Sequence, residues 1–159
     1  MKFIKEAIPY IIIIVSVVLI RTFIITPVRV DGESMLPSFE NGEIVMLSKI
    51  PREYKRMEVV VFYHNDERLI KRVIGLPGEK VHIKDNVIYI NGEAISDYDS
   101  NVLTDDYNLD ITIPEGYYFL LGDNRYGSLD SRIIGLIGKE DIKGKIVFRI
   151  FPFNKIKKI

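Results

Sequence analysis

The sequence contains no cysteine and only two histidines among its 159 residues. Without cysteine the chain can form no disulfide, no thiolate nucleophile and no Cys-ligated zinc site. His82 alternates with Val81 and Ile83, as an outward-facing strand residue does, and His64 follows a β-branched run. Both positions predict ordinary surface side chains, so a Ser-His-Asp triad or a histidine-bound zinc site is hard to build.

Two common serine-hydrolase motifs are also missing. The G-x-S-x-G elbow is absent, because Gly32-Glu33-Ser34 continues into Met35 and Leu36. The S-x-x-K motif is absent at the same serine, because position 37 is proline.

There is no excess of charge of either sign. The chain holds 22 basic and 22 acidic residues, and no basic stripe stands out. This balance gives no support for nucleic-acid binding. Hydrophobic residues make up 47% and charged residues 28%, a composition typical of a folded protein, and the length suits one domain with a modest core.

A long apolar run spans Ala7–Ile25, in which only Arg21 is charged. A transmembrane helix needs roughly 20 such residues. A cleaved signal peptide has an apolar region of about 7–15 residues, which Ile11–Ile20 would satisfy, but no small-x-small cleavage pattern follows it. A buried core helix is the third reading, although a β-branched run is a poor helix former in water. The membrane anchor is the favoured interpretation.

Two lysines precede the apolar run, at positions 2 and 5. The positive-inside rule then places the amino terminus in the cytoplasm, although two arginines on the other side weaken this bias. We therefore predict a cytoplasmic N-terminus and single-pass anchor over residues 1–26. Residues 27–159 are predicted to form one extracytoplasmic domain of the cell membrane protein.

Beyond Pro27 the chain consists of short β-branched and aromatic runs separated by turns. Asp85-Asn86 and Asn91-Gly92 are typical hairpin turns. The fold class predicted is mainly β: an all-β domain of short strands, either a sandwich or a partly closed barrel. The predicted strands cover residues 28–32, 43–49, 58–64, 68–75, 79–85, 86–92, 93–96, 110–113, 116–123 and 145–151.

An acidic segment, Ser96–Asp110, lacks any such pattern. Its first acidic positions have the spacing of an EF-hand calcium loop. That loop then requires Gly and Glu where this chain has Val102 and Asn108. We predict a solvated surface loop and no metal site.

A serine protease without histidine needs another base, and lysine serves in Ser-Lys enzymes. A lysine with an ordinary pKa of about 10.4 is neutral in only about 1 molecule in 2,500 at pH 7, so a catalytic lysine must be buried. Lys71 fits best, because strand alternation places it on one face with Leu69 and Val73. On pattern alone, a solvated lysine on a surface strand remains an open alternative, and Ser34 alone is an ordinary turn residue.

Three segments favour the catalytic reading of Ser34 and Lys71 over the surface reading. Together, and in the same order along the chain, they resemble segments of type I signal peptidases, the Ser-Lys dyad family that includes bacterial leader peptidase. Residues 32–39, GESMLPSF, are similar to the family's nucleophile segment. Residues 71–79, KRVIGLPGE, are similar to its base segment, and residues 121–132, LGDNRYGSLDSR, to its carboxy-proximal segment. With the anchor, the resemblance covers essentially the whole chain.

The resemblance implies a catalytic role for two of these residues. Ser34 would attack the scissile carbonyl, and Lys71 would act as general base and then as acid. The Ser34 backbone N–H would stabilise the oxyanion. Some family members add a serine hydroxyl two residues before the nucleophile, where this chain has Gly32, so the second donor stays open.

Further positions are implied to support the site. Ser128 would hydrogen-bond the Lys71 amine, and Asp130 and Arg132 would form an ion pair with Arg72 nearby. Substrate pockets suited to small side chains would be lined by Val28, Val30, Met35, Phe39, Leu69 and Ile70. The strand edge near Val28–Gly32 would pair with an extended substrate. Met35, Leu36 and Phe39 are also candidates for contact with lipid headgroups.

The implied substrates are preproteins with small residues at the first and third positions before the cut, held in the same lipid bilayer as the enzyme. No cofactor or metal is expected. Three other interpretations remain: a self-cleaving repressor of the same broad fold, a membrane-anchored β-domain that only binds a partner, and an inactive relative. The first lacks support because no DNA-binding domain or self-cleavage site is present, and the third because Ser34, Lys71 and Ser128 are all present.

Overall fold

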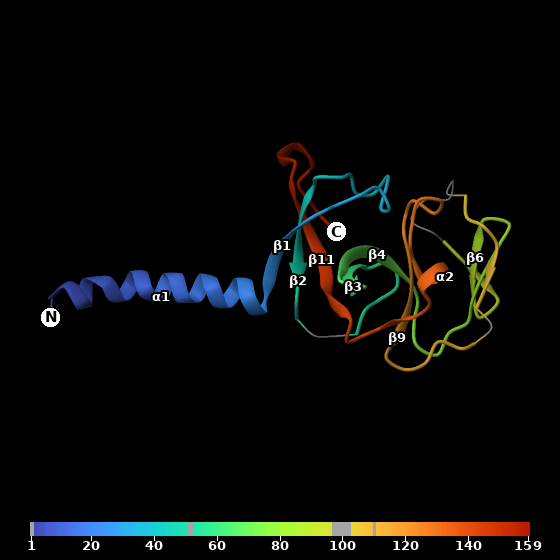
Figure 1. Cartoon of the computed structure of the whole chain (residues 1–159), viewed down its shortest axis with the longest axis horizontal. Helices are drawn as coiled ribbons and strands as arrows, with labels where there is room; N and C mark the ends of the chain where they lie inside the picture. The colour runs from blue at the N-terminus through green and yellow to red at the C-terminus, as the bar shows by residue number, and fades with distance from the viewer. Residues whose placement is uncertain (1, 51–52, 97–102, 110) are drawn as a thin grey trace.

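A computed structural model describes residues 2–50, 53–96, 103–109 and 111–159, with side chains from Ala7 onward. It shows one long amino-terminal helix followed by a mainly β domain with short antiparallel strands (Figure 1). The predicted fold class is confirmed in this respect.

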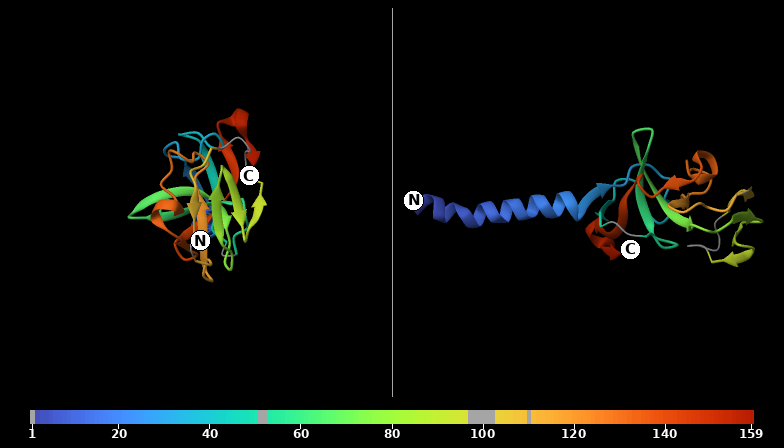
Figure 2. Two further views of the ribbon diagram at one scale, coloured as in Figure 1. Left: turned by 90° about the vertical axis from the view of Figure 1, so that its right-hand side faces the viewer. Right: turned by 90° about the horizontal axis from the view of Figure 1, so that it is seen from below.

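Helix α1 (Lys2–Phe23) projects away from the β domain (Figures 1 and 2). Its side chains from Ala7 to Phe23 are all exposed. Two side chains of the domain hold its carboxyl end: the Thr26 hydroxyl donates to the Arg21 carbonyl at 2.7 Å, and Lys49 Nζ donates to the Thr22 carbonyl at 3.1 Å. None of the helices in the described part of the chain is long and apolar enough to cross a membrane, so the predicted transmembrane helix is not confirmed.

The larger sheet has eight antiparallel strands, in the order β1-β2-β11-β3-β4-β9-β10, with β12 beside β11. Helix α2 lies between β9 and β10 along the chain, and the 3-10 helix η1 lies between β11 and β12. The bounds are β1 Ile25–Arg29, β2 Ile44–Ser48, β3 Val59–His64, β4 Glu67–Gly75, β9 Tyr117–Leu121, α2 Ser131–Ile134, β10 Ile137–Gly138, β11 Ile142–Phe151, η1 Phe153–Lys155 and β12 Lys157–Lys158. The sheet curls until β4 approaches β1, where Arg68 donates a hydrogen bond to the Arg29 carbonyl at 3.1 Å.

The smaller sheet has four strands in the order β7-β6-β5-β8: β5 Val81–Lys84, β6 Val87–Ile90, β7 Glu93–Ile95 and β8 Tyr107–Asn108. Asp85 and Asn86 have φ values of 50° and 65°, and Asn91 and Gly92 of 52° and 88°. Positive φ at both central residues is the conformation of type I′ turns, which join two-residue hairpins. Both predicted hairpin turns are confirmed.

The acidic segment departs from the predicted solvated loop in its second half. Thr104 is buried, and β8 pairs with β5. Residues 97–102 lie outside the described part of the chain. They include the acidic positions that were compared with the start of an EF-hand loop. The strand predicted over residues 110–113 is absent at 111–113, and residue 110 is not described. Ile113 is instead buried and exchanges main-chain hydrogen bonds with Gly78 and Glu79.

Three clusters of buried apolar residues form the core. One packs β1, β2, β3, β4 and β11 against the turn before β2; the second lies among β3, β4, β9 and β11; and the third joins the smaller sheet to β4 and β9. The first cluster contains Val28, Val30, Met35, Phe39, Val45, Leu47, Val59, Val61, Ile70 and Ile146. This cluster determines where the segment around Ser34 lies.

Candidate active site

Ser34 lies in the turn between β1 and β2. Gly32 enters this turn with φ of +89°, a conformation that residues with a Cβ rarely adopt. Met35 and Phe39 are 1% and 2% exposed, and the Phe39 N–H donates to the Met35 carbonyl at 2.8 Å. Because these two side chains are packed in the core, the half-buried Ser34 between them and β1 is held in one place.

Lys71 comes from the middle of β4, where it pairs with Val60 of β3. Its side chain is 1% exposed. Its Nζ lies 2.7 Å from Ser34 Oγ in a hydrogen bond and donates a second one to the Ile70 carbonyl at 3.0 Å. The structure therefore brings together the two residues that the sequence predicts as nucleophile and base, across 37 positions of the chain.

Burial changes the protonation of this amine. Desolvation lowers the pKa of Lys71 from 10.5 to about 8, while the nearby carboxylates of Asp130 and Asp123 oppose this shift. With a pKa of about 8, roughly one amine in ten is neutral at pH 7. The solvated-lysine alternative left open by the sequence pattern is therefore wrong, since Lys71 is neither exposed nor on an outer face.

The segment after β9 packs directly against the serine turn. The Asn124 N–H donates to the Ser34 carbonyl at 3.0 Å, and the Asn124 side chain donates to the Glu33 carbonyl at 3.2 Å. A methyl group at Gly122 would overlap the Ser128 side chain and lie 2.6 Å from the Ser34 carbonyl oxygen. Only glycine permits so close an approach at this position.

Ser128 lies beside the dyad but does not make the predicted hydrogen bond. Its hydroxyl is buried and has no hydrogen-bond partner among the described residues. The Lys71 amine donates to Ser34 and to the Ile70 carbonyl instead. The predicted contact of Ser128 with Lys71 is therefore wrong in this conformation.

Two ion pairs support the segment behind Lys71. Arg132 and Asp130 pair at 2.8 Å as expected, and Asp130 also accepts from the Gly122 N–H at 3.0 Å. Arg72, expected near that pair, binds Asp123 instead, with Nε and Nη2 at 2.8 and 2.5 Å from the two carboxylate oxygens. Arg72 Nη2 also donates to the Ser38 hydroxyl at 3.3 Å. This ion pair ties the serine turn to β4 and to the segment after β9.

Of the six predicted pocket residues, five belong to the same buried cluster: Val28, Val30, Met35, Phe39 and Ile70. Leu69 does not; it packs against the second cluster, with Val60 and Val73. This follows from strand alternation, because neighbouring residues of β4 face opposite sides. The burial of Met35 and Phe39 also contradicts their predicted contact with lipid headgroups.

The Ser34 backbone N–H donates no hydrogen bond to any residue that the structure describes. It is therefore free to donate a hydrogen bond to a ligand oxygen. Gly32 supplies no hydroxyl, and its own N–H donates to Asn41 Oδ1 at 3.1 Å. The main-chain N–H of Ser34 is thus an unengaged donor beside the Ser34 hydroxyl.

Sequence reasoning assigned no role to Asp123, Asn124 or Glu43. Asp123 and Asn124 lie within the segment that carries the resemblance, so that segment was the available signal. Glu43 is 3% exposed and forms an ion pair with Arg149 at 2.9 Å, below the serine turn. The sequence does not indicate this ion pair, because a glutamate just before a strand is usually exposed to solvent.

Neither of the two histidines, both of which the structure describes, forms a hydrogen bond with Ser34 or Lys71. His82 is exposed, as predicted, and His64 ends β3. Within residues 2–50, 53–96, 103–109 and 111–159, no three His, Asp or Glu side chains are grouped to hold a metal ion. The chemistry available at the site is that of a hydroxyl beside a buried amine.

The chain is similar to known proteins over most of its length. The family model described as "Signal peptidase, peptidase S26" matches residues 2–151. Signal peptidase I of Bacillus amyloliquefaciens is 40% identical, over 93% of this chain and 88% of that protein. Signal peptidase IB of Staphylococcus aureus is 37% identical, over 96% of this chain and 94% of that protein.

A solved structure is also similar. The crystal structure of a signal peptidase I from Enterococcus faecalis superposes with a TM-score of 0.54 at 36% sequence identity. The match covers 59% of this chain and 97% of the crystallised one.

Proposed function

The chain belongs to the signal peptidase family, peptidase S26, and on this basis we propose that it is a type I signal peptidase with Ser34 as nucleophile and Lys71 as general base. The observation that carries the proposal is the 2.7 Å hydrogen bond between Lys71 Nζ and Ser34 Oγ, formed by a lysine with a buried side chain. Buried amines next to a serine hydroxyl have few structural reasons to exist, because desolvating the cation costs free energy.

The proposed reaction is an acyl transfer to serine. When the Lys71 amine is neutral, its lone pair accepts the Ser34 hydroxyl proton while Oγ attacks the scissile carbonyl carbon. The negative charge that develops on the carbonyl oxygen is stabilised by the Ser34 backbone N–H. The resulting ammonium then donates its proton to the leaving amine, and the C–N bond breaks. In a second step, water activated by the same amine hydrolyses the acyl-enzyme.

The depressed pKa of Lys71 makes this base usable near neutral pH. Its shift from 10.5 to about 8 corresponds to about 3 kcal/mol of differential interaction between the two protonation states. A solvated lysine would act as a base in far fewer molecules at the same pH. In the proposal, the apolar packing around β4 supplies this difference.

The supporting residues then have positioning roles. Asn124 fixes the main chain at Ser34, and the Arg72–Asp123 pair fixes β4 against the serine turn. Asp130 is bound by Arg132, and its carboxylate keeps the lysine pKa from falling further.

Specificity for small side chains would arise from the cluster around Val30, Met35 and Ile70, which leaves little space beside Ser34. The substrate would lie as an extra strand along the edge of β1, which β2 leaves unpaired on its other side. Side chains at the first and third positions before the cut would then face this cluster, and only small ones would fit.

The proposal is tested by incubating the detergent-solubilised protein with a preprotein that has an Ala-x-Ala sequence before its cleavage site. We expect a single cut after the second alanine, identified by the mass of the mature product. Replacing that alanine with leucine lowers kcat/KM by at least about 10-fold, since one misplaced side chain in a shallow pocket costs about 1–3 kcal/mol. A matched leucine substitution at the position between the two alanines has little effect. Absence of cleavage, or cleavage elsewhere, contradicts the proposal.

We also propose that α1 attaches the enzyme to the cell membrane, with the amino terminus in the cytoplasm and residues 27–159 outside. The exposed apolar side chains of α1 support this, as does its projection from the domain (Figure 1). The carboxy-terminal hairpin lies at the end of the domain nearest α1 in both views and exposes Phe151, Phe153 and Ile156 (Figures 1 and 2). These side chains, rather than Met35 and Phe39, would reach the headgroups.

Membrane attachment would hold the enzyme and its tethered substrates at the same surface, which raises their effective concentration. The expected result is that the whole chain sediments with membranes and resists extraction by high salt. A variant that lacks residues 1–23 remains in the supernatant. A protease added outside the cell should digest the β domain but leave an amino-terminal tag intact. Loss of the tag, or a soluble whole chain, contradicts this topology.

A further inference from the structure

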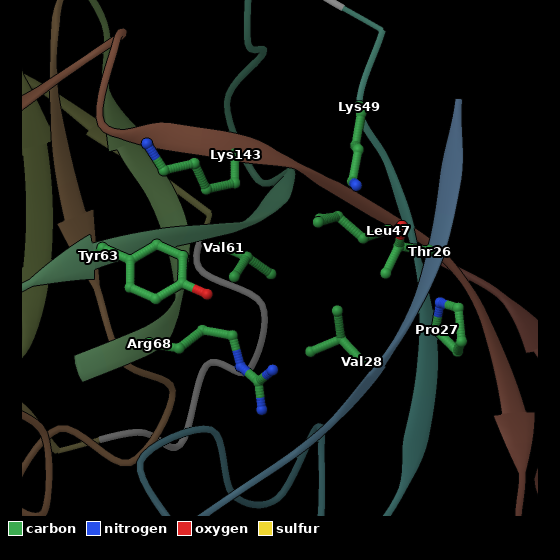
Figure 3. Close-up of a pocket in the computed structure, with 9 residues that line it drawn as sticks. All are labelled: Thr26, Pro27, Val28, Leu47, Lys49, Val61, Tyr63, Arg68 and Lys143. Carbon is green, nitrogen blue, oxygen red and sulfur yellow. The ribbon is translucent and has the colours of Figure 1, made fainter. Parts of the chain in front are cut away.

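The proposed substrate groove is the unpaired edge of β1 beside the cluster of Val30, Met35 and Ile70. A cavity lies next to it, toward the start of β1, and Figure 3 shows the residues that line it. It has a volume of about 370 Å³ and lies among β1, β2, β3, β4 and β11. Its lining consists of Thr26, Pro27, Val28, Leu47, Lys49, Val61, Tyr63, Arg68 and Lys143. None of these residues has a role in the proposed chemistry at Ser34.

The walls of the cavity are continuous with those of the groove. Val28, Leu47 and Val61 line it and also belong to the cluster that contains Val30 and Ile70. On β1, Val28 is two residues before Val30, so the cavity is displaced by about one strand repeat, roughly 6–7 Å, toward α1. A chain that runs along β1 away from Ser34 therefore reaches the cavity after it has passed the groove.

The charged side chains that line the cavity are all basic. Its lining includes three basic side chains and no acidic one. Figure 3 shows the Lys49 amine, the Tyr63 hydroxyl and the Arg68 guanidinium directed toward its interior. Arg68 is paired with Asp31 at 2.9 Å, but in the described part of the chain no acidic side chain forms an ion pair with Lys49 or Lys143. The cavity is therefore electropositive.

Arg68 also occupies a main-chain position that a substrate would use. Val30 exchanges hydrogen bonds with Gly42 and Glu43, just before β2, so the carbonyl of Arg29 faces the unpaired edge of β1. Arg68 Nη2 donates to that carbonyl at 3.1 Å. A substrate strand that pairs with β1 would supply an N–H to this carbonyl and release the guanidinium toward the substrate's own side chain.

Strand alternation identifies which substrate residue reaches the cavity. If the side chains at the first and third positions before the cut face the body of the enzyme, the next one on the same side is the fifth. The fourth and sixth point away. The fifth position also lies one strand repeat beyond the third, which matches the displacement of the cavity from the groove.

We propose that this cavity is a subsite for the fifth residue before the cleaved bond, and that it favours an acidic over a basic side chain there. A carboxylate is attracted by Lys49 and can accept hydrogen bonds from Tyr63 and Arg68, whereas a lysine is repelled. Lys143 adds a more distant positive charge, because Figure 3 shows its amine directed away from the interior. An uncharged polar side chain is intermediate. The inference rests on the proposed function, because it assigns a substrate preference to that same groove.

The test uses the whole chain in detergent without phospholipid, and peptide substrates with Ala-x-Ala before the cut. Glu, Gln or Lys is placed at the fifth position, and in a second series at the sixth. We expect kcat/KM to be about 10-fold higher for Glu than for Lys at the fifth position at low salt, and the ratio to fall as salt is added. At the sixth position the ratio stays within about twofold.

Two charge reversals identify the cavity as the source of the preference. Lys49→Glu and Lys143→Glu should each lower the Glu-to-Lys ratio by at least about threefold. Lys143 is the more informative because, among the described residues, its amine bonds to the Glu140 carbonyl and lies 5.9 Å from the centre of the Tyr63 ring, so its replacement leaves α1 undisturbed. The matched control is Lys84→Glu, an exposed reversal on β5 of the smaller sheet, which should leave the ratio unchanged.

Three outcomes overturn the inference while leaving the proposed function intact: cleavage with equal rates for Glu and Lys, a ratio that is the same at the sixth position, or a ratio unaffected by both reversals. A charge preference that appears only when vesicles of anionic phospholipid are added also overturns it, and would assign the cavity to a lipid headgroup. If none of the Ala-x-Ala peptides is cut, the proposed function fails and the inference fails with it.

Discussion

Replacement of Lys71 by Ala, or of Ser34 by Ala, is expected to lower kcat/KM for preprotein cleavage by at least about 10³-fold. In the proposed mechanism neither residue catalyses the reaction without the other, because the Ser34 hydroxyl is a weak nucleophile until the Lys71 amine takes its proton. The double replacement should therefore be no worse than either single one. The measurement is the initial rate of conversion of a purified preprotein, with circular dichroism to verify folding.

Different substitutions at Lys71 distinguish the loss of the basic amine, which should abolish activity, from the loss of packing volume, which should lower stability. Lys71→Met keeps most of the side-chain volume in a site that is 1% exposed, so it should be inactive but at least as stable as the parent. Lys71→Arg should also be inactive, because a guanidinium does not lose its proton in this pH range. The control is Lys80→Met, at an exposed position just before β5, which should retain full activity. Normal rates in Lys71→Ala would show that another group is the base.

The strand pattern made Lys71 the best candidate for a buried base, because Leu69, Ile70, Val73 and Ile74 around it are apolar, but it left a solvated lysine open. A lysine between Leu69 and Val73 in a β-branched strand is under local constraint, whatever the rest of the fold does. The local strand pattern could not predict the contact between Lys71 and Ser34. The two lie 37 residues apart, and only the ordered motifs, not the local pattern, linked them.

Contacts of single side chains were less predictable. The expected bond from Ser128 to Lys71 depends on the direction of one hydroxyl, and the amine is already engaged by Ser34 and the Ile70 carbonyl. The partner of Arg72 is Asp123, 51 residues away, which β9 brings alongside β4. Such choices depend on the register of neighbouring strands, including the irregularity between Val73 and Gly75, and periodicity carries no information about it.

The surroundings of apolar residues in turns were also not predictable from the sequence. Met35 and Phe39 are equally compatible with a lipid-facing loop and with a core anchor, and the sequence offered no means to distinguish them. The structure buries both, because the turn before β2 folds inward over β1 and β4. Burying them also positions Ser34, so the apolar residues of this turn contribute to the site by packing rather than by contact with lipid.

The second large effect concerns pH, and it follows from how Lys71 is held. Burial lowers the pKa of the amine to about 8, and the carboxylates of Asp130 and Asp123 limit the shift by stabilising the ammonium. The base is the neutral amine. Its population is therefore nearly complete above the pKa, one half at the pKa, and falls by a factor of ten for each pH unit below it.

We therefore expect kcat/KM to rise with pH, to be half-maximal near pH 8, and to be about 100-fold lower at pH 6 than at pH 9. The measurement is a pH–rate profile at constant ionic strength with an uncharged peptide substrate. A histidine base would give a midpoint near 6.5 instead. Replacing both His64 and His82 with Gln should leave the profile unchanged, because neither contacts Ser34 or Lys71. A profile that falls above pH 8 would mean that the ammonium is the required form, and a midpoint near 10 would mean that the amine is solvated when substrate binds. Either result would contradict the role of Lys71 as a buried base.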